Sequence, residues 1–257
     1  MEKITSINNQ LIKDIYQLKQ KKYRNQTKKF MVEGLHLVEE AYKNKVLKIV
    51  LSNDELLLNK FNNVKTVLVN NQIIEKLSNT TTPQNVLGVV DIIENKFELA
   101  DKYLILDGVN DPGNLGTIIR TSLALGVDHL ILSNNTVDIY NDKAIRATQG
   151  AIFKANIYYT DLEDIYIKLK QNNIKIITTS LEANKTLNDL EKMDKFAIVV
   201  GNEANGISNV SKEYADELII IPMKNNIESL NVGIASGIIL YGVLNKWVTL
   251  KELYMYY

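Results

Sequence analysis

From residue 102 onward, short apolar runs alternate with segments in which apolar side chains recur at helical spacing. Each apolar run is nearly continuous, as expected of strands that are covered on both faces. This alternation predicts an α/β fold with a mostly parallel sheet and helices on both sides. The predicted strands are Tyr103–Leu106, Val127–Leu132, Ala155–Tyr159, Ile174–Thr178, Phe196–Val200 and Glu217–Ile221, and the predicted helices are Leu115–Leu125, Leu162–Gln171 and Val232–Leu250.

The preceding part of the chain shows a similar alternation over a shorter length and predicts a small, separate α/β domain. A charged stretch without a clear period, Glu94–Asp101, indicates the linker, and we therefore expect domains at residues 1–96 and 97–257. The expected helices of the first domain are Asn9–Lys22, Leu35–Lys43 and Gln72–Leu77, and its expected strands include Leu47–Leu51, Thr66–Val69 and Val86–Ile93.

The chain of 257 residues has no cysteine and two histidines, His36 and His129. This composition excludes a disulfide framework, a zinc–thiolate site and a cysteine nucleophile, and it disfavours a multi-histidine metal site. No apolar run reaches the ~20 residues of a membrane span, and the first residues lack the apolar region of a signal peptide. We expect no metal, no membrane partner and a cytoplasmic location.

Charge is balanced overall, with 30 basic and 30 acidic residues, but it is unevenly distributed. Six cations fall between positions 19 and 29, with no acid among them. Such a run is typical of a solvated helix end or of an arm that contacts phosphates. The second interpretation makes Lys21, Lys22 and Arg24 candidate contacts, which together with Lys19 would point outward from the first helix.

Three polar segments follow predicted strands and lead into helices. The first, Leu106–Arg120, has glycines at 108, 113 and 116. This spacing fits neither the dinucleotide fingerprint nor a phosphate-binding P-loop. Its candidate side chains are Asn114 at the helix start and Arg120 within the helix. Taken alone, Asn114 is typical of a helix N-cap and Arg120 of a surface ion pair.

The second and third segments lie beyond the carboxyl ends of strands, where ligands bind in open α/β sheets. In the second, a buried strand ends at Gly201 and Glu203 follows. In the third, a strand ends near Ile221 and a polar loop leads to Ser229 and Asn231 at a helix start. Taken alone, Glu203 is typical of a carboxylate near a helix N-terminus and Ser229 of an N-cap.

Together, the three segments resemble the motifs of the SpoU (TrmH) family of RNA ribose 2′-O-methyltransferases, and the resemblance covers nearly the whole chain. The family has an Asn followed six residues later by Arg, a strand ending in Gly-x-Glu-x-x-Gly, and an Ile-Pro-Met that leads to Ser-Leu-Asn-Val. The matching residues are Asn114 and Arg120, then Gly201, Glu203 and Gly206, and finally Ile221–Met223 and Ser229–Val232.

The resemblance implies a deep trefoil knot in the C-terminal sheet and a homodimer with the active site near the subunit interface. It implies S-adenosyl-L-methionine (SAM) as methyl donor, held largely by backbone groups, without a metal. The stretch Phe30–Val90 resembles the family's substrate-binding domain, which has a ribosomal-protein L30e-like α/β fold. The implied cofactor contacts are Thr179, Gly201, Ile221 and Leu230, the implied catalytic residues are Asn114, Arg120, Glu203, Ser229 and Asn231, and the candidate RNA contacts are Lys21, Lys22 and Arg24.

The implied chemistry requires activation of a ribose 2′-hydroxyl, because the sulfonium methyl is already reactive. Arg120 would act either as a base, which a pKa above about 12 makes awkward, or as a cation that holds a phosphate and stabilises the developing alkoxide. The other four catalytic candidates would position this arginine, the loop and the ribose.

The main hypothesis is 2′-O-methylation of a ribose in ribosomal RNA, in particular 23S rRNA, because the shortest transfer-RNA enzymes of the family lack the N-terminal domain. The alternatives are the same reaction on transfer RNA, a non-catalytic RNA-binding relative, and a nucleotide-dependent metabolic enzyme. The missing phosphate motifs count against the last of these. The expected partners are RNA and a second copy of the chain, with neither DNA nor a membrane.

Overall fold

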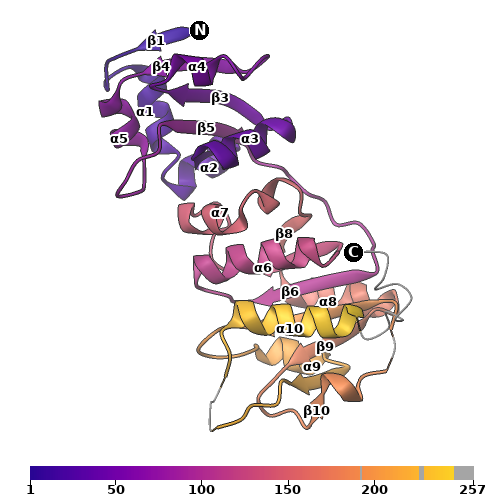
Figure 1. Ribbon diagram of the computed structural model, residues 1–257. Helices are drawn as coiled ribbons and strands as arrows, with labels where there is room; N and C mark the ends of the chain where they lie inside the picture. Colours follow the sequence, from indigo (N-terminus) through magenta and orange to yellow (C-terminus); the bar gives the residue numbers. More distant parts are fainter. Residues whose placement is uncertain (192, 226–228, 246–257) are drawn as a thin grey trace, which may run out of the picture. The chain divides into compact units, whose positions relative to one another are not determined.

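The computed structural model describes residues 1–191, 193–225 and 229–245, which fall into two compact units (Figure 1). The first unit comprises Met1–Glu94 and Tyr140–Lys154. The second comprises Asn95–Ile139 and the described residues from Ala155 onward. The chain thus passes from one unit to the other at three points, the first of which lies in the expected linker.

The first unit is built on a five-stranded sheet. Its strands are β1 (Glu2–Ile4), β2 (Lys29–Glu33), β3 (Leu47–Ser52), β4 (Lys65–Val69) and β5 (Val86–Asp91), and its helices before residue 94 are α1 (Gln10–Gln17), α2 (Lys21–Thr27), α3 (Leu35–Lys43), α4 (Glu55–Leu58) and α5 (Asn71–Leu77). The strand order is β1-β4-β3-β5-β2, with β5 antiparallel to both of its neighbours. Apolar residues of α1 and α5, including Ile12 and Ile73, form one core cluster with the sheet.

The single helix expected at Asn9–Lys22 is wrong, because the chain breaks after Gln17 and starts a second helix at Lys21. The buried guanidinium of Arg24 stabilises this break. Its Nη1 donates to the carbonyl oxygens of Leu18 and Lys19, at 2.9 and 2.8 Å, close to the end of α1. Arg24 is 8% exposed. The expectation that Arg24 points outward is therefore also wrong.

Lys19 is likewise turned inward rather than outward. Its Nζ donates to the backbone oxygens of Lys76 and Ser78 at the end of α5, at 3.1 and 2.8 Å. Two of the four cations expected on the surface thus bond to carbonyl oxygens near helix ends, where positive charge is favourable. Lys21 and Lys22 are exposed, as expected.

The segment 140–154 joins the first unit, whereas the sequence places it within the second domain. It contains α7 (Asp142–Thr148) and η1 (Ala151–Phe153). Phe30 packs against Tyr140 and Phe153, with ring centroids 4.7 and 6.3 Å apart, and Lys154 pairs with Glu40 at 2.8 Å. These partners are distant in sequence, and no local periodicity indicates them.

The second unit is built on a seven-stranded parallel sheet in the order β10-β12-β9-β11-β6-β7-β8. The predicted mostly parallel α/β sheet is confirmed. The strands are β6 (Lys102–Asp107), β7 (His129–Ser133), β8 (Ile157–Thr160), β9 (Lys175–Thr179), β10 (Lys185–Thr186), β11 (Phe196–Gly201) and β12 (Glu217–Ile220), and the helices are α6 (Pro112–Ala124), α8 (Leu162–Gln171), η2 (Leu187–Asp189), α9 (Asn209–Tyr214) and α10 (Val232–Asn245).

Helices cover the sheet of the second unit through two sets of contacts. α8 and α9 pack against each other, and Tyr166 of α8 joins Tyr103 and Ile105 of β6 in one core cluster. α6 and α10 lie side by side (Figure 1), and α10 also contacts β11. The last residues of the helix predicted at Val232–Leu250 lie outside the described residues. Within the described ranges, no helix has the length and hydropathy that crossing a bilayer requires.

Candidate active site

Four neighbouring strands of the second unit, β12, β9, β11 and β6, end along one edge of the parallel sheet. Beyond these ends lies a cavity of about 330 Å³, lined by the loops after β9, β11 and β12 and by the start of α10. Its volume falls at the lower end of the range of small-molecule sites, about 300–1,000 Å³. The edge is the one at which open α/β sheets bind ligands.

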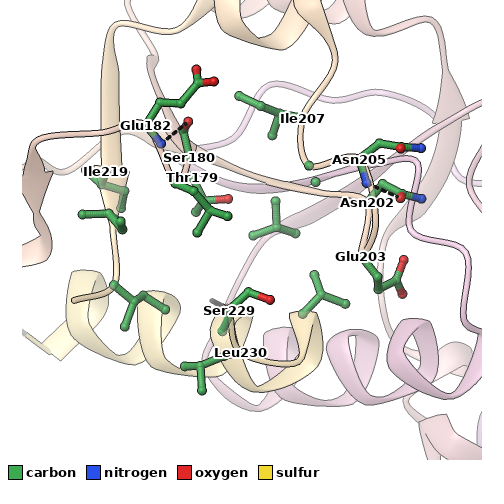
Figure 2. Close-up of a pocket in the computed structure, with 18 of the residues that line it drawn as sticks. Thr179, Ser180, Glu182, Asn202, Glu203, Asn205, Ile207, Ile219, Ser229 and Leu230 are labelled. Carbon is green, nitrogen blue, oxygen red and sulfur yellow. Dashed lines mark hydrogen bonds between the residues drawn. The ribbon is translucent and has the colours of Figure 1, made fainter. Parts of the chain in front are cut away.

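The structure brings the four predicted cofactor contacts together on this cavity. Thr179, Gly201, Ile221 and Leu230 all line it, although they come from four different segments. Much of the remaining wall is aliphatic, as Ile207 and Ile219 illustrate in Figure 2. An apolar cleft edged by the ends of strands suits a flat ring system with polar edges.

Two glycines shape the loop that follows β11. The chain turns back on itself here, because the backbone of Asn202 bridges to that of Gly206. A Cβ on Gly201 would lie 2.3 Å from the carbonyl carbon of Gly206, a separation that no side chain tolerates. Gly206 has a φ of +68°, in the left-handed region that favours glycine. The Gly-x-Glu-x-x-Gly spacing is thus required by the shape of the loop.

Glu203, in the same loop, joins three of the predicted catalytic residues. Its carboxylate accepts hydrogen bonds from the backbone N–H groups of Asn110 and Asp111, at 3.1 and 3.2 Å, and from Asn114 Nδ2 at 3.0 Å. Asn231 Nδ2 in turn donates to Asn114 Oδ1 at 2.9 Å. Partial burial opposes ionisation of Glu203, but these donors outweigh it and hold its pKa below the ordinary value. An ionised carboxylate can only accept hydrogen bonds, so it takes the Nδ2 group of Asn114. The Oδ1 of Asn114 is then left to accept from Asn231, which gives the hydrogen-bonded chain Glu203–Asn114–Asn231.

The helix caps differ from those expected. Asp111, not Asn114, caps α6, because Asp111 Oδ1 accepts from the Asn114 backbone N–H at 2.8 Å. Asn231, not Ser229, lies at the start of α10, where its Oδ1 accepts from the backbone N–H of Gly233 at 2.9 Å. The side chain of Asn114 is therefore available for the polar chain described above.

Asp107, at the end of β6, is a positioning residue that sequence reasoning missed. It is 4% exposed, and its Oδ2 accepts from Ser208 N at 2.7 Å and from Ser211 Oγ at 2.6 Å. Asn202 Nδ2 donates to the carbonyl oxygen of the next residue, Gly108, at 2.7 Å. Both ends of the loop 202–208 are thus tied to the end of β6. The available signal was an acid directly after a predicted buried strand.

Arg120 and Ser229 are separate from this network. Arg120 is exposed on α6, does not line the cavity, and makes no hydrogen bond or ion pair with any residue that the structure describes. Ser229 lines the cavity but is exposed, and it follows directly on residues outside the described ranges. In the described ranges, no group of three or more His, Asp or Glu side chains is arranged to hold a metal ion.

Comparison with known proteins gives the same picture over both units. Residues 101–241 match the SpoU rRNA methylase family, and residues 9–88 match an MRM3-like substrate-binding domain. The chain is 34% identical to a 23S rRNA (guanosine(2553)-2′-O)-methyltransferase of Bacillus subtilis, over 94% of this chain and 98% of that protein.

Two further proteins extend the comparison. A 23S rRNA (guanosine-2′-O-)-methyltransferase of Escherichia coli is 37% identical over 56% of this chain and 59% of its own length. A crystal structure of an AdoMet-bound rRNA methyltransferase from Sinorhizobium meliloti superposes with a TM-score of 0.84 at 30% identity, over 96% of this chain and 99% of that one. By its motifs, its fold and its relatives, the chain belongs to the SpoU rRNA methylase family.

Proposed function

We propose that this protein transfers the methyl group of SAM to the 2′-hydroxyl of a guanosine ribose in 23S ribosomal RNA. The observation that carries the proposal is the cavity at the strand ends, which gathers Thr179, Gly201, Ile221 and Leu230 beside the chain Glu203–Asn114–Asn231. The reaction and the RNA are those named for the Bacillus subtilis relative, which the chain matches over almost all of its length.

The lining of the cavity fits SAM. Its aliphatic walls suit an adenine ring, and the strand ends that line it offer backbone groups for the polar edge of the ring. We assign these contacts to Thr179, Gly201, Ile221 and Leu230. Gly201 and Gly206 keep the loop after β11 folded back on itself beside the cavity, where its backbone can serve the ligand.

The protein's contribution to the reaction is positioning and charge. SAM supplies an already activated methyl group. Arg120 carries a permanent positive charge, and it holds the RNA backbone and stabilises the oxyanion that develops on the 2′-oxygen. As the C–O bond forms and the C–S bond breaks, the hydroxyl proton passes to water. Asn114, Glu203 and Asn231 hold the loop through their hydrogen bonds, and together with Ser229 they position the ribose.

The assembly that we propose is a homodimer formed through α10. Ile234 and Ile238 are 57% and 41% exposed and lie four residues apart, and therefore on one side of the helix. Exposed apolar side chains that lie together on one face can mark an interaction site, and we assign this face of α10 to the dimer interface. Sedimentation analysis should give twice the mass of the chain, and a monomer would contradict this part of the proposal. We also propose that the second unit contains a deep trefoil knot and that the first unit has an L30e-like fold.

We propose that the first unit holds the ribosomal RNA, with Lys21 and Lys22 as phosphate contacts. We also propose that the reaction takes place in the cytoplasm.

The proposed activity is tested by methyl transfer from radiolabelled SAM to 23S rRNA, to transfer RNA and to a DNA oligonucleotide of matched sequence. We expect label in 23S rRNA at one ribose, mapped as a site resistant to alkaline cleavage. DNA cannot accept it because it lacks the 2′-hydroxyl. Label in transfer RNA alone, or in no RNA, would contradict the proposal.

A further inference from the structure

A second polar feature of the cavity lies apart from Glu203. Lys212, on α9, and Glu182, in the loop after β9, both line the cavity. Lys212 Nζ lies 3.0 Å from Glu182 Oε2. The two side chains are 40% and 77% exposed. The pair therefore forms part of an open edge of the cavity rather than part of the core.

The backbone around Glu182 is fixed while its side chain is not buried. Ser180 Oγ accepts from the Glu182 backbone N–H at 3.1 Å (Figure 2), and the Ser180 N–H donates to Ile219 O at 2.9 Å. An exposed ion pair contributes only about 0–1 kcal/mol to stability. Folding therefore gives little reason for placing this pair at the cavity.

Charge among the described cavity residues is confined to three side chains, Glu182, Glu203 and Lys212. Glu203 is committed to Asn114 and to two backbone N–H groups. Lys212 and Glu182, by contrast, are paired with each other across an exposed surface. A ligand that offers one anion and one cation can replace this pair by two charge-assisted hydrogen bonds.

We infer that Lys212 and Glu182 bind the α-amino acid end of SAM, with Lys212 on the carboxylate and Glu182 on the ammonium group. The inference rests on the proposed function. An α-amino acid is the zwitterion that matches the pair, whereas the nucleoside arm is uncharged and suits the aliphatic walls. Figure 2 shows Glu182 and Glu203 on opposite sides of the drawn residues, and the amino acid end therefore lies away from the chain Glu203–Asn114–Asn231.

The test compares two ligands by calorimetry, S-adenosylhomocysteine and 5′-methylthioadenosine. They share the nucleoside and the sulfur, but only the first has the amino acid end. In the wild-type protein we expect S-adenosylhomocysteine to bind more tightly. Lys212→Met and Glu182→Gln should each weaken it about tenfold or more, the usual effect of one hydrogen bond to a charged group, and leave 5′-methylthioadenosine within twofold.

Matched controls separate charge recognition from a change in the cavity. Lys212→Arg keeps the cation and should retain most of the affinity for S-adenosylhomocysteine. Lys185→Met removes the lysine of another ion pair, Lys185–Glu217, which does not line the cavity, and should change neither affinity. Equal weakening of both ligands, or of neither, in the Lys212 and Glu182 variants would overturn the inference while SAM use stands. Wild-type protein that binds neither ligand would overturn the proposed function itself.

Discussion

Two glutamates, one in each unit, hold a loop by hydrogen bonds, and their surroundings differ. Glu33, at the end of β2, is 8% exposed and accepts from Ser78 Oγ, Thr80 Oγ1 and the backbone N–H groups of Asn79 and Gln84. Glu203 is exposed and accepts from Asn114 and two backbone N–H groups beside a cavity. The same chemistry thus occurs once in a buried setting and once in an open one.

The partners of the two carboxylates indicate which of them serves the fold and which serves the reaction. Every donor to Glu33 belongs to one short stretch, 78–84, and the carboxylate replaces the secondary structure that the stretch lacks. Among the donors to Glu203, Asn114 also accepts a hydrogen bond from Asn231 at the start of α10. This network therefore joins segments that are far apart in sequence. Removing the first should cost stability, whereas removing the second should cost activity.

Arg120 makes no hydrogen bond or ion pair within the described ranges, and its loss should reduce activity more than any other substitution considered. Arg120→Ala should lower methyl transfer on the order of a hundred- to a thousandfold, the usual cost of removing one oxyanion-stabilising donor. It should leave the thermal transition and the affinity for S-adenosylhomocysteine nearly unchanged, because Arg120 is exposed and does not line the cavity. Steady-state transfer to 23S rRNA measures the activity, and calorimetry measures the thermal transition and the affinity for S-adenosylhomocysteine. More than a tenth of normal turnover would contradict this role.

The second prediction tests the comparison directly. Burial opposes ionisation of Glu33, but its four donors prevail and hold its pKa below the ordinary value. Its stabilising effect is therefore full above about pH 4.5, the unfolded value, and is lost as the pH falls through the lower folded pKa. At pH 7, Glu33→Gln should lower the free energy of unfolding by about 1.5–3 kcal/mol.

Glu203→Gln is the matched variant, since it makes the same change in the open setting. It should lower the rate of methyl transfer about tenfold or more, because the new amide donor faces the donors of Asn114 and the backbone. Its effect on unfolding should be smaller than that of Glu33→Gln. Chemical denaturation and transfer assays on both variants are needed. If Glu203→Gln proves the more destabilising of the two, the distinction between the two glutamates is wrong.

Sequence reasoning was most successful where a signal is local. The strands of the parallel sheet have continuous apolar runs, and the cavity residues Gly201, Ile221 and Leu230 lie in the short motifs that carry the family resemblance, the first two near strand ends and Leu230 just before α10. It failed where partners come from far along the chain. The capture of carbonyls by Arg24, the docking of 140–154 on Phe30 and the anchoring of Ser208 by Asp107 each depend on contacts that no periodicity displays.

The third prediction concerns a second buried titratable group, His129, and the dependence of stability on pH. Burial among Phe97, Tyr103 and Tyr158 lowers the pKa of His129 below its ordinary value of 6.5, and its Nδ1 has no hydrogen-bond partner among the described residues. The unfolded chain therefore binds a proton near pH 6.5 that the folded chain binds only at lower pH. Stability should fall as the pH drops below about 6.5, by at most about 1.4 kcal/mol per pH unit.

The variant His129→Phe isolates this contribution. It keeps an aromatic ring in the cluster and removes the proton-binding site. In urea denaturation between pH 5 and pH 7, the free energy of unfolding of the wild type should fall on the acid side relative to that of the variant, so the gap between the two curves changes there. Parallel curves would show that burial of His129 has no part in the pH dependence of unfolding.

The smallest expected effect concerns the exposed cations of the first unit. Lys21 and Lys22 lie on the surface at the start of α2, whereas Arg24 of the same run is buried against Leu18 and Lys19. Each phosphate contact to single-stranded RNA adds about 0.7 to the slope of log affinity against log salt. Lys21→Ser/Lys22→Ser should therefore flatten this slope by about 1.4, without loss of stability. Filter binding at several salt concentrations measures the slope.

The control variant for this experiment loses the same number of positive charges at other positions of the first unit. Lys13 and Lys60 are also exposed, and Lys13→Ser/Lys60→Ser removes two positive charges without touching α2. If attraction to RNA depended only on net charge, both double variants would flatten the slope equally. A specific contact flattens it in the first variant alone. Arg24→Ser must stay out of the comparison, because losing its two bonds to the end of α1 destabilises the fold and would lower RNA binding for a different reason.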